Sequence, residues 1–460
     1  MKHLVYALGI LLTGHLAAAE GKPNLIFILA DDLGYGELGC YGQESIETPH
    51  LDQLAKEGMR FTQAYAGGSV CAASRSVLMT GLHNGHTAAR DNVPHYPTYL
   101  KKDDLTLAEV LQEVGYHCGG IGKWSLGDPG TEGRATAQGF DSWFGYLNQD
   151  HAHYYYPAYL DDDEGRLELP GNLENHTDYS NDLMTERTLK FIKESRETPF
   201  FFYAAYTVPH FGSTSEDPTS FPVPSDAPYS DRTDWDRASK NYAAMITRLD
   251  RDVGRIVDLI DELGLAENTL IIFSSDNGPW GKAPKRFASS GPLRGVKTNL
   301  YEGGIRMPFI ARWLGVVPGD SVNDEPIAFH DVLPTFAELA GATIPDHIDG
   351  ISFTAALKGE SIEDPHEYFY WDYGHCRPRY DQAVRLGNWK GIRLGVGSPI
   401  QLFDLASDLG ETTDIASAHP DVVSRIDGIM SRAVTPSANY PVGTIYRGKA
   451  IWQAPGPPKP

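Results

Sequence analysis

Asn24-Leu25-Ile26-Phe27-Ile28-Leu29-Ala30 forms a continuous apolar run, and the paired carboxylates Asp31-Asp32 follow it directly. A strand with one face in water alternates apolar and polar residues, whereas a continuous run is typical of a parallel strand covered on both faces. Two further segments have this character, Leu270-Ile271-Ile272-Phe273 and the aromatic-rich stretch from Pro199 to Tyr206. The sequence therefore predicts a largely parallel sheet that is buried between two layers.

Helical patterns separate these strands. Thr48-Pro49 begins one that Gly58 ends, and a longer one runs from about Asn241 to Leu263 with its apolar residues on one stripe. Strands that alternate with helices indicate an α/β fold with a large, mixed and mostly parallel sheet.

The pattern changes after about residue 360. Three short segments, Glu367–Trp371, Gln382–Arg385 and Trp389–Arg393, read as strands joined by glycine turns, which favours a small antiparallel sheet. A chain of 460 residues also exceeds what one core usually holds. We therefore expect a main domain at residues 20–360 and a smaller C-terminal subdomain at 361–460, ending in an extended, proline-rich tail.

Residues 1–19 have the pattern of a signal peptide, with a short basic start, an apolar stretch and small residues before Glu20. This pattern predicts export to the periplasm or the extracellular space. No later segment approaches 18 uninterrupted apolar residues, so stable membrane insertion is not expected. The formal net charge of −22 argues against a nucleic acid partner. The four cysteines lack the spacing of a disulfide framework, so each is considered for its own chemistry.

Carboxylates follow two of the apolar runs. Asp31 and Asp32 follow the first, and Asp276 and Asn277 follow the run at 270–273. Functional groups collect at the carboxyl ends of parallel strands, where three carboxylates would repel one another without a cation. Oxygen ligands of this kind select calcium or magnesium over zinc. The alternative is that each Asp separately caps a helix or forms a turn.

Cys71-Ala72-Ala73-Ser74-Arg75 begins a predicted helix that Gly81 ends. A Cys at a helix N-terminus lies where backbone N–H groups favour an anion, and Arg75 one turn later could hold an anionic group. The alternative is a buried structural Cys beside a surface Arg.

This segment, with Leu78-Met79-Thr80-Gly81, resembles the signature of the type I, formylglycine-dependent sulfatases of the alkaline phosphatase superfamily. Five further family motifs are similar and occur in family order: Asp31-Asp32, Gly122-Lys123-Trp124, Pro209-His210, Ser275-Asp276-Asn277-Gly278, and Gly295-Val296-Lys297 before Glu302-Gly303-Gly304. The resemblance extends over nearly the whole chain and is to arylsulfatases and to bacterial carbohydrate sulfatases of the N-acetylgalactosamine-6-sulfatase type.

The resemblance implies an alkaline-phosphatase-like sandwich and a set of roles. One Ca²⁺ per chain would be bound by Asp31, Asp32, Asp276, Asn277 and the modified Cys71. A formylglycine-generating maturation enzyme would convert Cys71 to formylglycine (3-oxoalanine), whose hydrated aldehyde supplies the nucleophile. Arg75, Lys123 and Lys297 would hold sulfate oxygens, and His210 would protonate the leaving oxygen. The implied substrate is a sulfated carbohydrate, with galactose or N-acetylgalactosamine types favoured.

Two positions depart from the family pattern. Ala73 replaces the signature Pro, and Ser125 replaces a His that many members have two residues after the Lys of Gly-Lys-Trp. We expect His153, in the aromatic-rich segment 151–157, to take over part of the work of that His; the alternative is an aromatic surface loop. Arg377 and Arg379 are candidate substrate-binding residues, with solvated charge as the alternative.

Two other functions remain open from the sequence. Phosphate and sulfate esters are nearly isosteric, so a phosphatase or phosphodiesterase of the same superfamily is one. An inactive glycan-binding homologue, in which Cys71 is never converted, is the other.

Overall fold

The computed structural model describes residues 21–92, 99–163, 165–212, 220–443 and 445. The predicted signal peptide at 1–19 and the proline-rich tail at 454–460 lie outside these residues. Within the described part of the chain, no helix combines the length and the apolar character that crossing a membrane requires.

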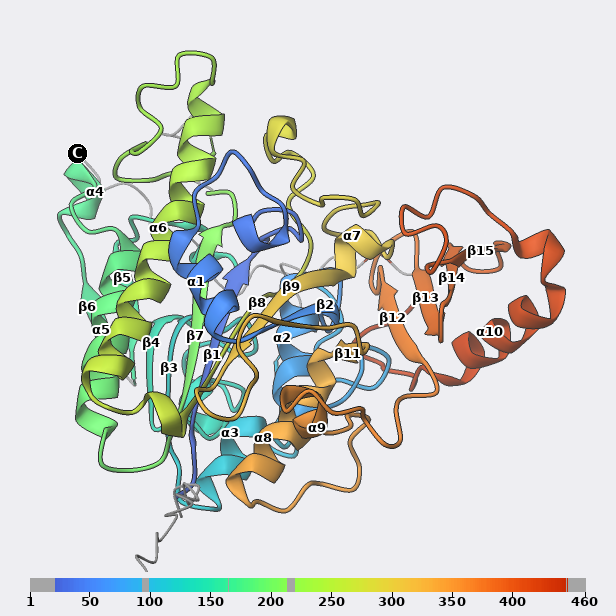
Figure 1. Ribbon diagram of the computed structural model, residues 1–460, viewed down its shortest axis with the longest axis horizontal. Coiled ribbons are helices and arrows are strands. Elements are labelled where there is room, and N and C mark those ends of the chain that lie inside the picture. The colour runs from blue at the N-terminus through green and yellow to red at the C-terminus, as the bar shows by residue number, and fades with distance from the viewer. Residues whose placement is uncertain (1–20, 93–98, 164, 213–219, 444, 446–460) are drawn as a thin grey trace, which may run out of the picture.

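A large mixed sheet forms the centre of the main domain (Figure 1). Its strand order is β10-β2-β9-β8-β1-β7-β3-β4-β5-β6, with β11 paired to β2. The strands are β1 Asn24–Asp31, β2 Met59–Tyr65, β3 His117–Lys123, β4 Ser142–Tyr146, β5 Tyr159–Asp162, β6 Gly165–Glu168, β7 Phe200–Pro209, β8 Thr269–Ser275, β9 Arg306–Arg312, β10 Ser321–Asn323 and β11 Ile327–Ala328. The α/β class and the mixed, mostly parallel sheet are thus confirmed.

The first apolar run is the central strand. β1 pairs in parallel with β7 on one side and with β8 on the other, and all eight of its residues are buried. Alternate side chains of β1 lie in two different cores. Leu25, Phe27 and Leu29 belong to the core on one face of the sheet, and Ile26, Ile28 and Ala30 belong to the core on the other face. Both faces of β1 are therefore dry, which explains why its sequence does not alternate.

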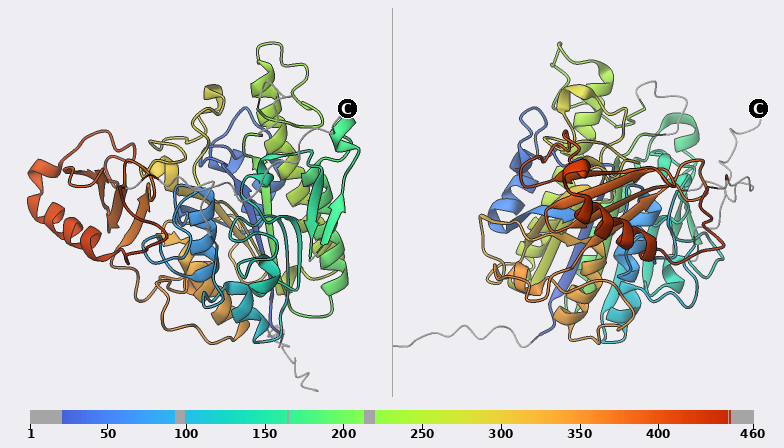
Figure 2. Two further views of the ribbon diagram at one scale, coloured as in Figure 1. Left: turned by 180° about the vertical axis from the view of Figure 1, so that it is seen from behind. Right: turned by 90° about the vertical axis from the view of Figure 1, so that its right-hand side faces the viewer.

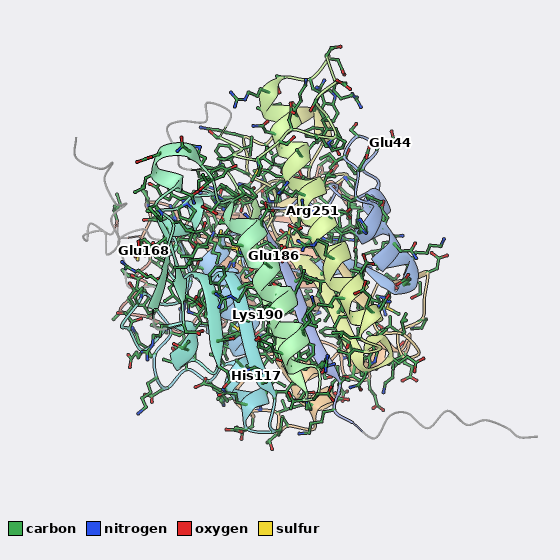
Figure 3. All side chains as sticks on the ribbon, turned by 90° about the vertical axis from the view of Figure 1, so that its left-hand side faces the viewer. Glu44, His117, Glu168, Glu186, Lys190 and Arg251 are labelled. Carbon is green, nitrogen blue, oxygen red and sulfur yellow. The ribbon has the colours of Figure 1, made fainter. Side chains whose placement is uncertain are left out.

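Helices cover both faces of this sheet (Figure 1). Residues of α2, α3 and α8 share a core with one face, and residues of α1, α5 and α6 share a core with the other. On the second face α5 and α6 lie side by side, with Glu186 and Lys190 on α5 and Arg251 on α6 (Figure 3). The helices are α1 Pro49–Glu57, α2 Cys71–Thr80, α3 Leu107–Gln112, α4 Asn172–Asn175, α5 Ser180–Ser195, α6 Arg237–Glu262, α7 Glu302–Ile305, α8 Val332–Ala340, α9 Thr354–Leu357 and α10 Pro420–Arg432.

The predicted small sheet is present beside the main domain (Figure 2, left). It is antiparallel, in the order β12-β13-β14-β15, and α10 packs on it. Its strands are β12 Phe369–Tyr373, β13 Asp381–Leu386, β14 Trp389–Leu394 and β15 Ile400–Asp404. The division of the chain at residues 360 and 361 stays a prediction.

A buried charge cluster joins the two parts. Glu302 of α7 accepts hydrogen bonds from Lys390 Nζ of β14 (2.7 Å) and from the Tyr65 hydroxyl of β2 (2.6 Å). Lys390 Nζ also lies 3.8 Å from the Glu411 carboxylate, and both carboxylates and the ammonium are fully buried. Buried charges of this kind are tolerated only when they are paired, so the C-terminal subdomain is held to the main sheet by specific partners.

Candidate active site

Four neighbouring strands deliver functional groups at their carboxyl ends. Asp31 is the last residue of β1 and Lys123 the last residue of β3, while His210 follows β7 and Asp276 follows β8. These strands are adjacent in the order β8-β1-β7-β3. Parallel strands all end at the same edge, which is where α/β sheets carry their sites. The sequence motifs are therefore brought together by the sheet.

Helix α2 presents Cys71 to this edge. Cys71 is its first residue, and Gly81 ends it in the left-handed conformation with φ 68°. All ten residues of α2 are buried. The thiol Sγ lies 3.4 Å from Asp31 Oδ1 and 3.2 Å from Lys297 Nζ. Burial and the nearby Asp31 raise the pKa of Cys71 to about 11, so the unmodified side chain is a thiol at neutral pH.

Each predicted cationic residue pairs with a carboxylate of the site. Lys123 Nζ lies 2.7 Å from Asp31 Oδ2, and Lys297 Nζ lies 2.6 Å from Asp32 Oδ1. The Arg75 guanidinium donates two hydrogen bonds to Asp276 Oδ2, at 2.8 and 3.1 Å. Burial alone would raise the pKa of Asp31, but Lys123, Arg75 and Lys297 hold that pKa well below its usual value.

The acidic residues fit a hard cation. Asp32 Oδ2 and Asn277 Oδ1 are buried oxygens without a hydrogen-bond partner, although the Asn277 amide N–H donates to Asp32 Oδ1 at 2.7 Å. Asp276 Oδ1 accepts the backbone N–H of Asp32 at 3.2 Å. Orphaned buried oxygens cost free energy unless something ligates them. This oxygen-rich set matches the ligands that calcium or magnesium prefers.

His210 and His153 form a stacked pair at the edge of the cluster. Their ring centroids are 4.4 Å apart with an interplanar angle of 12°. His210 Nε2 lies 3.5 Å from Asp32 Oδ2, while its Nδ1 donates to the Phe211 carbonyl at 2.7 Å. His153 Nε2 is buried without a partner. Burial lowers the pKa of His210 to about 4 and the pKa of His153 well below its usual value, so both rings are neutral here.

Ser125 occupies the position of the missing His. It lies two residues after Lys123 with φ 66°, and its buried hydroxyl has no hydrogen-bond partner. A free hydroxyl is a poor base near neutral pH.

The two candidate arginines lie in different surroundings. Arg377 makes a bidentate pair with the buried Asp91 at 2.8 and 2.7 Å and also donates to the Asn92 carbonyl at 2.7 Å. Asn92 Oδ1 in turn accepts the backbone N–H of Ala72 at 2.8 Å. Arg379 is 61% exposed and pairs with Asp381 at 2.7 Å. The link from Arg377 to the residue after Cys71 was not predicted, and no spacing in the sequence signals it.

An aromatic ladder continues outward from the histidines. Phe211 stacks on His210 with centroids 4.5 Å apart, and Trp280 stacks on Phe211 with centroids 4.3 Å apart. Trp280 is half-buried. The ladder ends at this indole, and Lys282 Nζ lies 5.6 Å from the centroid of its ring.

Comparisons with known proteins agree with this geometry. The sulfatase family model matches residues 23–342, and the C-terminal model of N-sulphoglucosamine sulphohydrolase matches residues 296–431. Arylsulfatase A of Homo sapiens is 33% identical, over 90% of this chain and 88% of that protein. N-acetylgalactosamine-6-sulfatase of Canis lupus familiaris is 33% identical, over 81% and 72%. The solved structure of Ps i-CgsB in complex with k-i-k-neocarrahexaose has a TM-score of 0.78 and 28% identity, covering 92% of this chain and 95% of that one. The strand-end carboxylates, the helix that begins at Cys71 and these matches identify the chain as a member of the sulfatase family, type I, of the alkaline phosphatase superfamily, and hence as a sulfuric ester hydrolase.

Proposed function

We propose that this sulfatase removes sulfate from a carbohydrate, with a formylglycine formed from Cys71 and one Ca²⁺. The observation that carries the proposal is the position of Cys71, at the start of a buried helix and within 3.4 Å of Asp31 and Lys297. The modified residue would supply a hydroxyl nucleophile activated by the metal. Asp31, Asp32, Asp276 and Asn277 would hold the Ca²⁺, and the unpartnered oxygens of Asp32 and Asn277 support this assignment.

The basic residues of the site would bind the sulfate group. Arg75, Lys123 and Lys297 all pair with carboxylates that the metal would also neutralise, so their remaining N–H groups are available to sulfate oxygens. Fixed cations in a dry site stabilise the charge that develops on those oxygens without reorganisation.

His210 would protonate the sugar oxygen that leaves. Its Nδ1–H is held by the Phe211 carbonyl, which leaves Nε2 to face the site beside Asp32. The neutral ring must gain a proton for this task, and a bound sulfate ester adds the negative charge that favours the imidazolium. Replacement by Ala should cost about 10²–10⁴ in rate on sugar sulfates and less on aryl sulfates, whose leaving group needs little protonation. Equal losses on both substrates would assign His210 to binding instead.

His153 would assist from the other side of the His210 ring. Its Nε2 has no partner and can accept a proton or orient the sugar. The variant His153→Ala separates the two roles: a base lowers kcat, whereas an orienting residue raises KM. A variant with unchanged kcat and KM would remove His153 from the site.

Three observations support a carbohydrate substrate. The relative from Canis lupus familiaris is named for N-acetylgalactosamine, Ps i-CgsB was solved with an oligosaccharide, and Trp280 ends the aromatic ladder as a stacking platform. Galactose or N-acetylgalactosamine sulfates are the types favoured. Residues 1–19 support export to the periplasm or beyond.

The decisive experiment is the intact mass of the peptide that contains residue 71. A formylglycine mass, together with activity on a sulfate ester that exceeds activity on the matching phosphate ester, is the expected result. Cys71→Ser should leave a folded protein with little turnover, because serine lacks the second hydroxyl of a hydrated aldehyde. An unmodified Cys71 in active protein, or full activity of Cys71→Ser, would remove formylglycine from the mechanism. Unmodified Cys71 in inactive protein would favour the glycan-binding alternative.

A further inference from the structure

A second group of metal-ligand side chains lies outside the active site, next to the C-terminal subdomain. It gathers residues from four separate segments: His83 and His86 after α2, His330 and Asp331 in the 3₁₀ turn Phe329–Asp331, Asp349 between α8 and α9, and His366 before β12. The rings of His83 and His86 stack with centroids 4.0 Å apart, and His83 also contacts Tyr370 of β12, with centroids 5.4 Å apart. The mechanism above uses none of these residues.

Three of them have donor atoms spaced as around one ion. His86 Nδ1 lies 2.9 Å from Asp349 Oδ2, and His83 Nε2 lies 4.0 Å from the same oxygen. The three donor atoms all lie within 4.8 Å of one another. A tetrahedron with zinc–ligand bonds of about 2.0–2.1 Å has edges of roughly 3.3 Å. The two observed donor–donor distances, 2.9 and 4.0 Å, lie on either side of this edge length, so small side-chain rotations would bring the three donors to the distances of a zinc coordination shell.

A cavity and an unpartnered nitrogen mark the same place. A cavity of about 180 Å³ is lined by His83, His330, Asp349 and His366 together with the start of β12. His83 is only 6% exposed, and its Nε2 has no hydrogen-bond partner. The cavity has room for an ion and a water molecule, and buried polar nitrogens without partners are rare in folded proteins.

A neighbouring group, formed by His330, Asp331 and His366, has a structural role instead. Asp331 Oδ1 accepts the backbone N–H of Ile351 at 2.9 Å and lies 2.6 Å from His366 Nε2. Asp331 Oδ2 accepts the backbone N–H of Ala328 at 2.8 Å. Both oxygens thus hold local structure. Asp349 also holds one backbone group, because its Oδ2 accepts the N–H of His83 at 2.9 Å, but its Oδ1 accepts no backbone N–H and lies 3.0 Å from His86 Nδ1. The ion therefore belongs with Asp349, and His330 lies across the cavity from it.

We propose that His83, His86 and Asp349 bind one divalent transition-metal ion of the zinc type, with a water molecule or His330 as the fourth ligand. Two imidazoles and one carboxylate select zinc-like ions over calcium, in contrast to the oxygen-rich active site. Binding changes the tautomers of both rings. The His86 proton shared with Asp349 moves to Nε2, and the His83 proton moves to Nδ1, so the 3.2 Å hydrogen bond that Nδ1 now accepts from Gly85 N–H is lost on binding.

Such an ion would have a structural effect. His83 and His86 lie in the segment that follows α2, the helix with Cys71 at its other end, and His83 touches β12 of the small sheet. The bound ion would therefore fix the end of the nucleophile helix relative to the C-terminal subdomain. A ligand that binds only the folded state raises the midpoint of thermal unfolding.

The test is a titration of the full-length Cys71→Ser variant with Zn²⁺ in excess Ca²⁺, so that neither the thiol nor the active-site carboxylates compete. We expect one Zn²⁺ per chain by calorimetry, an affinity at least 100-fold weaker in an added His86→Ala change, and no loss in the control His347→Ala, an exposed His in the same loop as Asp349. Zn²⁺ should raise the unfolding midpoint only where His86 is present.

Co²⁺ in place of Zn²⁺ gives a readout that needs no further substitution, because a tetrahedral nitrogen–oxygen site absorbs visible light far more strongly than octahedral Co²⁺. Absence of saturable binding, a weak octahedral spectrum, or equal affinity with and without His86 would each overturn the proposal. Activity is not a readout, so the proposal can fail while the sulfatase mechanism stands.

Discussion

Replacing Arg377 with Gln tests whether this arginine positions the nucleophile or binds substrate. The change removes three hydrogen bonds, two to the fully buried Asp91 carboxylate and one to the Asn92 carbonyl. A buried carboxylate that loses its partner destabilises a protein by about 3–5 kcal/mol. Asn92 would then no longer fix the N–H of Ala72, next to Cys71. A displacement of about 1 Å at a reacting group can cost about 10²-fold in rate, so kcat should fall by one to two orders of magnitude, about 10–100-fold, while KM changes little.

The assay is steady-state kinetics on an aryl sulfate, normalised to the fraction of Cys71 converted by mass spectrometry, alongside urea unfolding. The matched control is the double variant Arg377→Gln with Asp91→Asn, which restores a neutral pair and should recover stability and part of kcat. A raised KM on sugar sulfates with unchanged kcat would show that Arg377 contacts substrate instead. Lower stability with unchanged kcat would leave it a purely structural role.

Three further perturbations have expected outcomes. Gly122→Ala should abolish folding or activity, because Gly122 has φ 89° and an added Cβ would lie 1.8 Å from the Ala205 carbonyl oxygen, next to Lys123; a soluble, active variant would contradict the close packing of β3 on β7. Glu411→Gln should flatten the pH dependence of stability. Burial raises the pKa of Glu411 from 4.5 to about 7, so the folded protein binds this proton more tightly than the unfolded chain does. The free energy of unfolding of the wild type is therefore highest below pH 4.5 and falls by about 3 kcal/mol as pH rises through 7. Urea unfolding between pH 5 and 8 measures this, and parallel curves for variant and wild type would refute it. Asp276→Ala should abolish bound calcium and activity together, and elemental analysis that finds two zinc ions in the wild type would refute the calcium assignment.

The strands that carry the site could be predicted from the sequence, because a strand buried on both faces consists almost entirely of apolar residues. β1, β7 and β8 are dry on both faces, so each is a continuous apolar run. Boundaries were less certain: α6 begins at Arg237, four residues before the expected Asn241, because the Asp236 side chain accepts the N–H of Ser239 at 2.7 Å and caps the helix.

Other parts of the fold and site depend on contacts between distant segments. β9 runs antiparallel to β2 and β8, and together with the antiparallel pairs of β5 it makes the sheet mixed. No local pattern distinguishes β9 from a parallel strand. The support of Ala72 by Asn92 and Arg377 joins segments 285 residues apart. The Asp and Asn residues at strand ends were found because chain order alone places them there; their supporting partners come from tertiary packing.

The position of β1 in the sheet has a consequence in time. Its first partner, β7, begins at Phe200 and its second, β8, at Thr269, so the first strand of the domain has no neighbour until about 200 residues of the chain exist. At about 5–20 residues per second of synthesis, the 176 residues between Asn24 and Phe200 take roughly 9–35 s. For that interval a wholly apolar strand stays unpaired, and slow, long-range pairing of this kind exposes a chain to aggregation. The burial of Cys71 is delayed in the same way, because this side chain becomes fully buried only when α2 packs on the completed sheet. The maturation enzyme that we propose for this thiol would therefore have to act before α2 is buried, and its rate would compete with folding.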